Sequence, residues 1–321
     1  MYILELSLEE NEQLDALLRM LMEKYSLPCE EAFLLRVRAY AAQLPQRILH
    51  SLSEFKYREN HNGTLVLRGF HIDDSGIGET PAATSKEIDE GSARREGFML
   101  MLLISQIGDA FGWSCQRDGA LINNILPLKS HEKEQLSTGS MIDLDWHTEE
   151  AFHPFRADYL ALMCLRNIEQ IPTVIGSIQD INLDEETKKL LFEPRYLFQM
   201  DKNFENEHLK STLPQSVLFG DATAPYVKID PSFMQAVPGD EQAGEALRQI
   251  TLEFKKSLYE LVLQQGDVVF LDNYRVVHGR KAFPPRFDGT DRWLKRVNIT
   301  SDLRKSRVLR QHHGSRVIVI N

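Results

Sequence analysis

The sequence predicts a mixed α and β protein, with a double-stranded β-helix (jelly-roll) core and flanking helices. Helical periodicity dominates about residues 1–112, whereas short apolar stretches separated by turn residues dominate about 113–321. Many short strands that close into two facing sheets are typical of a jelly roll. One long helix, about 240–264, interrupts the strand series. Because no internal repeat or low-complexity linker divides the chain, we expect a single domain over 1–321.

The N-terminal part begins with a capped helix. Ser7 and Glu10 form a capping-box pattern, and leucines then recur at helical spacing until Pro28. A second helix is expected over 30–43, ahead of Pro45. The next segments predict a strand over 63–69, a loop over 73–92 and a helix over 94–111. Short strands are then predicted at 120–126, 140–147, 159–164, 215–219, 226–229, 267–271, 293–299 and 317–320.

Composition narrows the classes of partner. The chain has 37 Lys and Arg residues against 47 Asp and Glu residues, a net charge of −10, which argues against nucleic acid as a partner. The longest apolar run, 98–104, is too short to cross a membrane, and the first residues lack the pattern of a signal peptide. Three cysteines without a CxxC pair suit a reducing compartment. We therefore expect a soluble, cytoplasmic protein, and a homo-oligomer is compatible with the sequence.

His147-Thr148-Glu149 is an H-x-E pattern. Side chains two residues apart on a strand project from the same face, so this imidazole and this carboxylate can bind one metal ion. Two histidines with one carboxylate form the facial triad of non-haem Fe(II) oxygenases, which leaves positions open for a bidentate co-substrate and O2. A second match, His71-Ile72-Asp73, shows that the pattern alone does not identify the site.

The segment 266–280 offers the other histidine. It predicts a strand, a tight turn and a second strand that delivers His278 beside Gly279, where the glycine leaves room. Further on, strand alternation places Arg292 and Arg296 on one face. Two inward arginines are costly unless they meet anions, and the planar guanidinium suits a carboxylate. The alternative, a surface strand with solvated charges, is partly contradicted by a tryptophan on the opposite face.

Three stretches carry a resemblance to a known family: WHTEEAFHP from Trp146, ADYLAL from Ala157 and DNYRVVHGR from Asp272. Together with Arg292, they resemble the clavaminate synthase-like group of Fe(II)/2-oxoglutarate-dependent oxygenases. Within that group the chain is most similar to the hydroxylases of free arginine, asparagine or lysine. The likeness runs from about residue 116 to residue 298.

The resemblance implies Fe(II) as the metal, with 2-oxoglutarate and O2 as co-substrates. It implies that His147, Glu149 and His278 ligate the iron. Arg292 would pair with the distal carboxylate of 2-oxoglutarate, and Thr173 would hydrogen-bond to the same group.

The resemblance also implies residues that bind the amino acid. Arg296 would hold its α-carboxylate with help from Ser137, and Gln116 would lie near its α-amino group. In the family, acids after a strand ahead of the long helix face the substrate side chain. Asp230 is our first choice for that role and Asp221 the second, although a helix or turn cap is the competing interpretation of Asp230.

The acids suggest which basic amino acid binds. Some arginine hydroxylases offer a D-x-D pair, whereas this chain has Asp230 followed by Ser232. Because one carboxylate suits a compact ammonium better than a wide guanidinium, the sequence favours L-lysine, hydroxylated at C3 or C4. L-arginine and L-asparagine stay open as alternatives.

Two further functions are compatible with parts of the sequence. An enzyme with the same iron site would desaturate or cyclise a modified amino acid, as in antibiotic biosynthesis. Product mass separates this from hydroxylation, because hydroxylation adds one oxygen whereas the alternative removes two hydrogens. A metal-free jelly-roll module that binds a small ligand belongs to a different class. It predicts neither iron uptake nor oxygen consumption.

Overall fold

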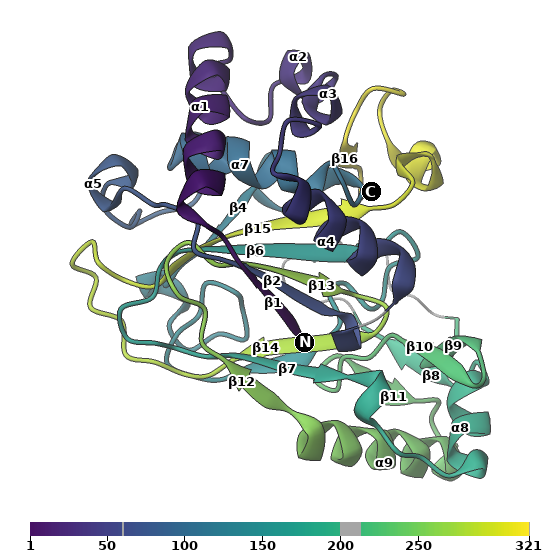
Figure 1. The fold of residues 1–321 in the computed structure, drawn as a ribbon. Helices are drawn as coiled ribbons and strands as arrows, with labels where there is room; N and C mark the ends of the chain where they lie inside the picture. The colour runs from purple at the N-terminus through teal and green to yellow at the C-terminus, as the bar shows by residue number, and fades with distance from the viewer. Residues whose placement is uncertain (60, 200–212, 321) are drawn as a thin grey trace.

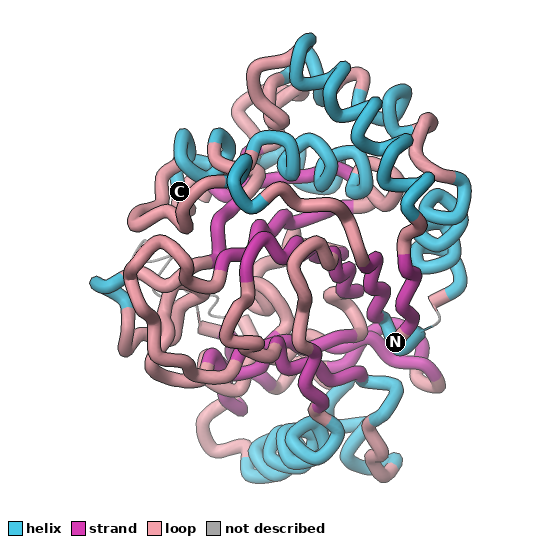
Figure 2. The backbone as a smooth tube through the Cα atoms, turned by 60° about the vertical axis from the view of Figure 1, so that its left-hand side comes forward, coloured by secondary structure: helices cyan, strands magenta, loops and turns pink. Residues whose placement is uncertain are grey.

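The structure is a computed structural model that describes residues 1–59, 61–199 and 213–320. Figure 1 shows a large and a small sheet, with helices over the outer face of each. Figure 2 shows the same arrangement from the side, with the strands between two helical layers. The expected mixture of helices and sheets is therefore confirmed.

The large sheet has eight strands in the order β1-β2-β13-β6-β15-β3-β16, with β4 also paired to β15. The strand β15 is central, because it pairs antiparallel with β6, β3 and β4. The strands are β1 Tyr2–Glu5, β2 Thr64–Arg68, β3 Asp109–Trp113, β4 Asn123–Ile125, β6 Tyr159–Arg166, β13 Val268–Asp272, β15 Trp293–Thr300 and β16 Val317–Ile318.

The small sheet has four strands in the order β12-β7-β14-β5, all antiparallel. Two separate pairs, β9 with β10 and β8 with β11, complete the strands of the described chain. The bounds are β5 Leu144–His147, β7 Thr173–Ser177, β8 Tyr196–Phe198, β9 Leu218–Asp221, β10 Ala224–Val227, β11 Met234–Ala236, β12 Tyr259–Leu261 and β14 Val276–Arg280.

Side-chain alternation divides the core into layers. On β13, Val268 and Phe270 pack towards the helices over the large sheet, whereas Val269 and Leu271 pack between the two sheets. Strand geometry requires this, because successive side chains point to opposite faces. The space around Val269 and Leu271 between the sheets is therefore apolar. Polar side chains occupy another part of the space between the sheets.

Helices cover the outer faces. The large sheet carries α1, α4 and α7, and the small sheet carries α8 and α9 (Figure 1). The capping box predicted at Ser7 and Glu10 is present at the start of α1. The helices are α1 Leu8–Lys24, α2 Glu31–Leu34, α3 Val37–Ala41, α4 Gln46–Arg58, α5 Asp74–Ile77, α6 Lys86–Gly91, α7 Arg94–Ile104, α8 Glu185–Phe192 and α9 Glu241–Ser257.

Four expected elements differ from the structure. The helix expected over 94–111 ends at Ile104, because the chain then becomes strand β3 and pairs with β15. The helix expected over 30–43 is two short helices, α2 and α3, and the turn between them allows apolar side chains of both to be buried. The loop expected over 73–92 contains α5 and α6, which Asp73 and Ser85 cap. The long helix expected over 240–264 ends at Ser257, because the chain then becomes strand β12 and pairs with β7.

Within the described residues, none of the helices combines the length and the apolar character that a membrane span requires.

Asp267, fully buried directly before β13, links the start of that strand to β2 in the large sheet. Its carboxylate accepts hydrogen bonds from Nε and Nη2 of Arg68 on β2, the shortest at 2.9 Å, and from the Gln264 amide at 3.0 Å.

We predict that Asp267→Ala lowers the free energy of unfolding by about 3 kcal/mol, because it removes one partner of a buried ion pair. Chemical denaturation measures the change. As a control, Glu245→Ala breaks an exposed ion pair with Arg248 on α9 and should leave the free energy nearly unchanged. Equal effects of the two variants would contradict the assignment.

Candidate metal and substrate site

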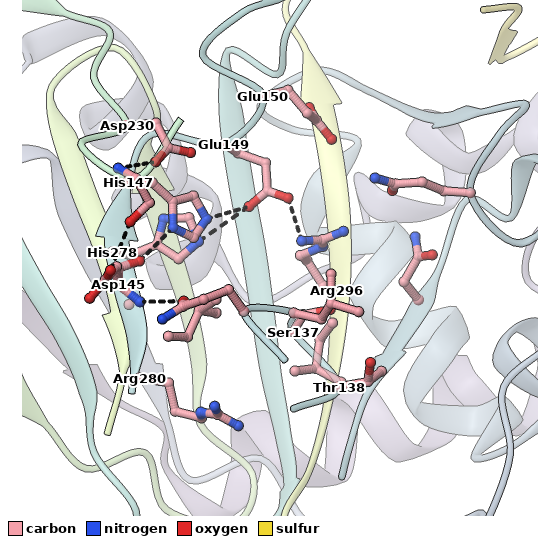
Figure 3. A pocket seen from close by; sticks show the side chains of 18 of the residues that line it. Ser137, Thr138, Asp145, His147, Glu149, Glu150, Asp230, His278, Arg280 and Arg296 are labelled. Atoms are coloured by element: carbon pink, nitrogen blue, oxygen red, sulfur yellow. Dashed lines mark hydrogen bonds and ion pairs between the residues drawn. The ribbon is translucent and has the colours of Figure 1, made fainter. Parts of the chain in front are cut away.

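A cavity of about 290 Å³ lies between the two sheets. Polar side chains from several strands and loops converge on it, as Figure 3 shows. Nine of the ten site residues expected from the sequence line this cavity: Gln116, Ser137, His147, Glu149, Thr173, Asp230, His278, Arg292 and Arg296.

The pairing of β14 with β5 brings the two histidines together. His278 lies opposite His147 in the register of these strands, and the ring centroids are 4.8 Å apart. Oε2 of Glu149 lies 3.3 Å from Nε2 of His278 and 3.7 Å from Nε2 of His147. One ligand atom from each of the three residues lies within 4.8 Å of the others, a spacing at which they can hold one metal ion.

The orientation of His147 suits metal binding. Its Nδ1 lies 2.8 Å from the carbonyl oxygen of Asp145, an acceptor, so Nδ1 carries the proton and donates it. A neutral ring in this tautomer directs the lone pair of Nε2 towards Glu149. Metal-binding histidines are commonly oriented in this way by a carbonyl or carboxylate on the other nitrogen. Two imidazoles and one carboxylate fit Fe(II) of the facial-triad type.

Glu149 is positioned by a residue from a distant part of the chain. The fully buried Asn273, in the turn between β13 and β14, accepts a hydrogen bond from the Glu149 amide at 2.8 Å. Its own amide group donates to the carbonyls of Glu149 at 3.1 Å and Ala157 at 2.8 Å. Asn273 therefore fixes the backbone of the metal-binding loop to the strand pair that carries His278.

Electrostatics keep Glu149 ionised. Burial alone would raise the pKa of its carboxyl, but the guanidinium of Arg296, which pairs with it, and the two histidines hold that pKa well below its usual value. Burial would likewise lower the pKa of His147, but Glu149 and Asp230 outweigh it and raise that pKa to about 9. A metal ion competes with this proton, because histidine ligates metals as the neutral imidazole.

Arg292 provides a buried cation at one end of the cavity. It is 4% exposed, and Nη2 donates to Oγ1 of Thr173 at 3.4 Å. Its Nε has no hydrogen-bond partner among the described residues. Burial lowers the pKa of Arg292 to about 10, so it remains protonated at neutral pH. A buried cation with unused donors fits a carboxylate ligand such as the distal end of 2-oxoglutarate.

Asp221 is the one expected site residue that the structure places elsewhere. It is exposed in the β9–β10 turn, and its Oδ1 accepts hydrogen bonds from the amide and hydroxyl of Thr223, both at 2.7 Å. Its carboxylate thus stabilises a turn, and it does not line the cavity. Asp230 does line the cavity, and it also has the turn-capping role considered as the alternative, because Oδ1 accepts from the amide of Ser232 at 3.1 Å.

The competing H-x-D match is a surface feature. His71 is exposed, with Nδ1 3.7 Å from Asp15, and the carboxylate of Asp73 caps α5. The described chain contains a single group of three such side chains with metal-binding spacing, and it is the one at His147.

Several residues that line the cavity were not expected from the sequence: Arg117, Gln135, Asp145, Ser232 and Arg280. Asp145 had a signal, because it stands two residues before His147 on one strand and therefore shares its face. Arg280 shares a face with His278 by the same rule, and its guanidinium donates to the carbonyls of Gly139 and Ile142. The other residues come from turns and loops, where no periodicity applies.

We predict that Asn273→Ala weakens Fe(II) binding tenfold or more, because the backbone that carries Glu149 loses its support. A metal titration monitored by calorimetry measures the affinity, and circular dichroism establishes that the variant is folded. Asn62→Ala is the matched control, since this asparagine donates to the carboxylate of Asp180 outside the cavity. A folded Asn273 variant with the affinity of the unmodified protein would refute this role.

Comparison with known proteins agrees with this geometry. The model of the taurine catabolism dioxygenase TauD, TfdA family matches residues 197–298. The enduracididine beta-hydroxylase of Streptomyces hygroscopicus is 38% identical, over 99% of this chain and 100% of its own. The L-ornithine/L-arginine 3-hydroxylase of Catenulispora acidiphila is 36% identical, over 87% and 88%. L-lysine hydroxylases also match, at 27% to 30% identity.

Solved structures give the same result. The non-heme iron oxygenase OrfP in complex with Fe and alpha-ketoglutaric acid superposes with a TM-score of 0.93, at 38% identity, over 98% of this chain and 99% of that one. Clavaminate synthase 2 of Streptomyces clavuligerus is 30% identical over 90% of each chain. With its His-Glu-His site and these relatives, the chain belongs to the TauD/TfdA family, as a clavaminate synthase-like, non-haem iron and 2-oxoglutarate-dependent dioxygenase of the amino-acid hydroxylase group.

Proposed function

We propose that this enzyme hydroxylates an unactivated carbon of a free amino acid with a guanidino side chain, L-arginine in the first place. The support comes from the relatives above 35% identity, which are named for enduracididine and for ornithine or arginine. The preference for lysine expected from the sequence is not supported, because the lysine hydroxylases match at lower identity. The expectation of lysine rested on the absence of a second acid next to Asp230 in the sequence, and it did not consider acids from other segments of the chain.

The observation that carries the proposal is the distribution of charge in the cavity. Arg296 comes from β15 of the large sheet, whereas Asp230 lies on the histidine side (Figure 3). Arg292 directly precedes β15 and lines the same cavity. A free amino acid has a carboxylate at one end and, when basic, a cation at the other. We infer that Arg296 binds the α-carboxylate and Asp230 faces the basic end. Ser137 and Gln116 would complete the contacts at the α-carbon.

The chain's own residues then determine the geometry of the reaction. His147, Glu149 and His278 would hold the iron, with the far carboxylate of 2-oxoglutarate on Arg292 and Thr173. When bound, iron, 2-oxoglutarate and O2 supply the oxidant that converts C–H to C–OH, with release of succinate and CO2. Because the amino acid is held at both ends, the distances from these two contacts to the metal determine which carbon faces it.

We further propose that the two facing sheets form a double-stranded β-helix and that 1–321 is a single domain. The central β15 contacts the N-terminal strands and helices as well as the metal-binding half, which supports one cooperative unit.

We predict that His147→Ala and His278→Ala abolish substrate-dependent succinate formation, because each removes a ligand of the triad. Succinate release and oxygen uptake measure this, with L-arginine as substrate. Full turnover by the His147 variant would contradict the assignment of His147 as a metal ligand. A protein that bound no iron and consumed no oxygen would instead be a binding module.

We predict that L-arginine or enduracididine gives the highest kcat/KM in a panel that includes L-ornithine, L-lysine and L-asparagine. Mass spectrometry of the product should show a gain of one oxygen, whereas a loss of two hydrogens would indicate desaturation. A clear preference for lysine would contradict the proposal.

We predict that Arg296→Ala raises the KM for the amino acid ten- to a hundredfold, because a charge-assisted bond to its carboxylate is lost. The KM for 2-oxoglutarate should change much less, because Arg292 remains. A change in the 2-oxoglutarate KM alone would contradict the division of roles between these arginines.

A further inference from the structure

Asp145 lies on the same side of β5 as His147. The strand alternates, so Trp146 packs outward against Phe254 while its two neighbours point to the cavity. Two residues along a strand span about 7 Å. That span is comparable with the distance from the β-carbon of arginine to its guanidinium. Asp145 is thus placed where the side-chain end of a substrate lies when its β-carbon faces the metal.

A single serine joins Asp145 to the acid already assigned to the substrate. The hydroxyl of Ser232 donates to Oδ2 of Asp145 at 2.7 Å, and the amide of Ser232 donates to Oδ1 of Asp230 at 3.1 Å. All three residues line the cavity. In Figure 3, Asp145 and Asp230 lie on the histidine side, across Glu149 from Arg296. The two carboxylates come from segments far apart in the chain and are brought together at one end of the cavity.

The backbone of Asp145 is fixed before any ligand binds. Its amide donates to Oε1 of Gln135 at 3.2 Å, and its carbonyl accepts from Nδ1 of His147 at 2.8 Å. Gln135 is itself anchored, because Nε2 donates to the carbonyl of Asp143 at 2.9 Å. The carboxylate of Asp145 therefore projects from a rigid position, as a selective binding group requires.

Independent evidence for a ligand comes from the other side of Glu149 in the cavity. Arg296 is 9% exposed, and its Nε has no hydrogen-bond partner among the described residues. A buried, incompletely bonded cation indicates an anionic ligand there. Two carboxylates that share one serine make this side of the cavity acidic, which favours a cationic group of a ligand. The cavity is therefore built for a ligand that is anionic at one end and cationic at the other.

The geometry points to Asp145 as the residue that selects a guanidinium over an ammonium. This inference rests on the proposed function, because it takes a basic amino acid as the substrate. A guanidinium is planar and presents donors in several directions, so it can address Asp145 and Asp230 at once. An ammonium is compact, and Asp230 alone can satisfy it. Asp145 and Ser232 thus supply, from two segments, the second acid that the chain lacks next to Asp230.

The test is Asp145→Asn, which keeps the size of the side chain and the backbone contact to His147. Binding of L-arginine and of its neutral analogue L-citrulline is measured by calorimetry, under anaerobic conditions, on protein loaded with Fe(II) and 2-oxoglutarate. We expect the Kd for L-arginine to rise tenfold or more. The Kd for L-citrulline should change less than threefold, because only the charge has been removed.

Two control variants show whether the effect is specific to Asp145. Asp221→Asn removes an exposed acid in the β9–β10 turn, outside the cavity, and should leave both Kd values unchanged. Asp230→Asn should weaken L-arginine and L-lysine alike, whereas Asp145→Asn should weaken L-arginine more than L-lysine. The Fe(II) affinity of Asp145→Asn should equal that of the unmodified protein, which would exclude damage to the neighbouring His147.

The outcomes separate this inference from the proposed function. If the unmodified protein binds L-lysine in preference to L-arginine, the proposed substrate class is wrong. If it prefers L-arginine and Asp145→Asn keeps that affinity within twofold, the role of Asp145 is wrong. Equal weakening of L-arginine and L-citrulline would also overturn it, because the effect would then be one of shape. Selective loss of L-arginine would support it.

Discussion

The pairing of β14 with β5 is the constraint on which the site depends. It places His278 opposite His147, and the small sheet thus supplies two imidazoles on adjacent strands without help from a flexible loop. The third ligand, Glu149, lies just beyond the end of β5, where the chain has left the sheet. A residue outside a strand needs its own support, and Asn273 gives it by bonding the Glu149 backbone in both directions. The geometry of the metal site therefore depends on the register between β14 and β5 and on the buried side-chain amide of Asn273.

The interior of this fold contains many charged side chains, and several of them pair with one another. Lys295, on the helix-facing side of β15, is fully buried, and its ammonium donates to the carbonyl of Asp89 at 2.9 Å. Asp89 in turn pairs with Arg117 at 2.6 Å. Burial lowers the pKa of Lys295 to about 8, so its charge is maintained at neutral pH only weakly. Arg280, Arg292 and Arg296 line the cavity, and the Nε of each has no hydrogen-bond partner among the described residues. Their guanidinium groups therefore keep donors for a carboxylate ligand.

The alternation of side chains along strands explains which site residues could be predicted from the sequence. Arg292 and Arg296 were expected on one face because strand side chains alternate, and both line the cavity. Asp145 followed the same rule but was overlooked. The contribution of Asn273 could not be predicted, since its partners are backbone atoms 124 and 116 residues away in sequence. Asp221 was expected in the site because an acid that stabilises a turn looks, in a sequence, like an acid that binds a ligand. The end of α9 was missed for a similar reason: the residues of β12 fit either period, and pairing with β7 decides between them.

The two ends of the cavity come from different structural sources. The arginines stand on or next to β15 in the large sheet, whereas Asp145 projects from β5 in the small sheet and Asp230 follows β10. In the proposed function, an amino acid bound between them would span the two sheets, with its carboxylate on one and its side chain along the other. The carboxylate end is common to all amino acids, but the side-chain end is not. Because these contacts lie on separate elements, the acids can be substituted without displacing the arginines or the histidines. In the proposed function, short segments next to β5 would determine which amino acid binds, and the register of β14 and β5 would hold the metal for the reaction.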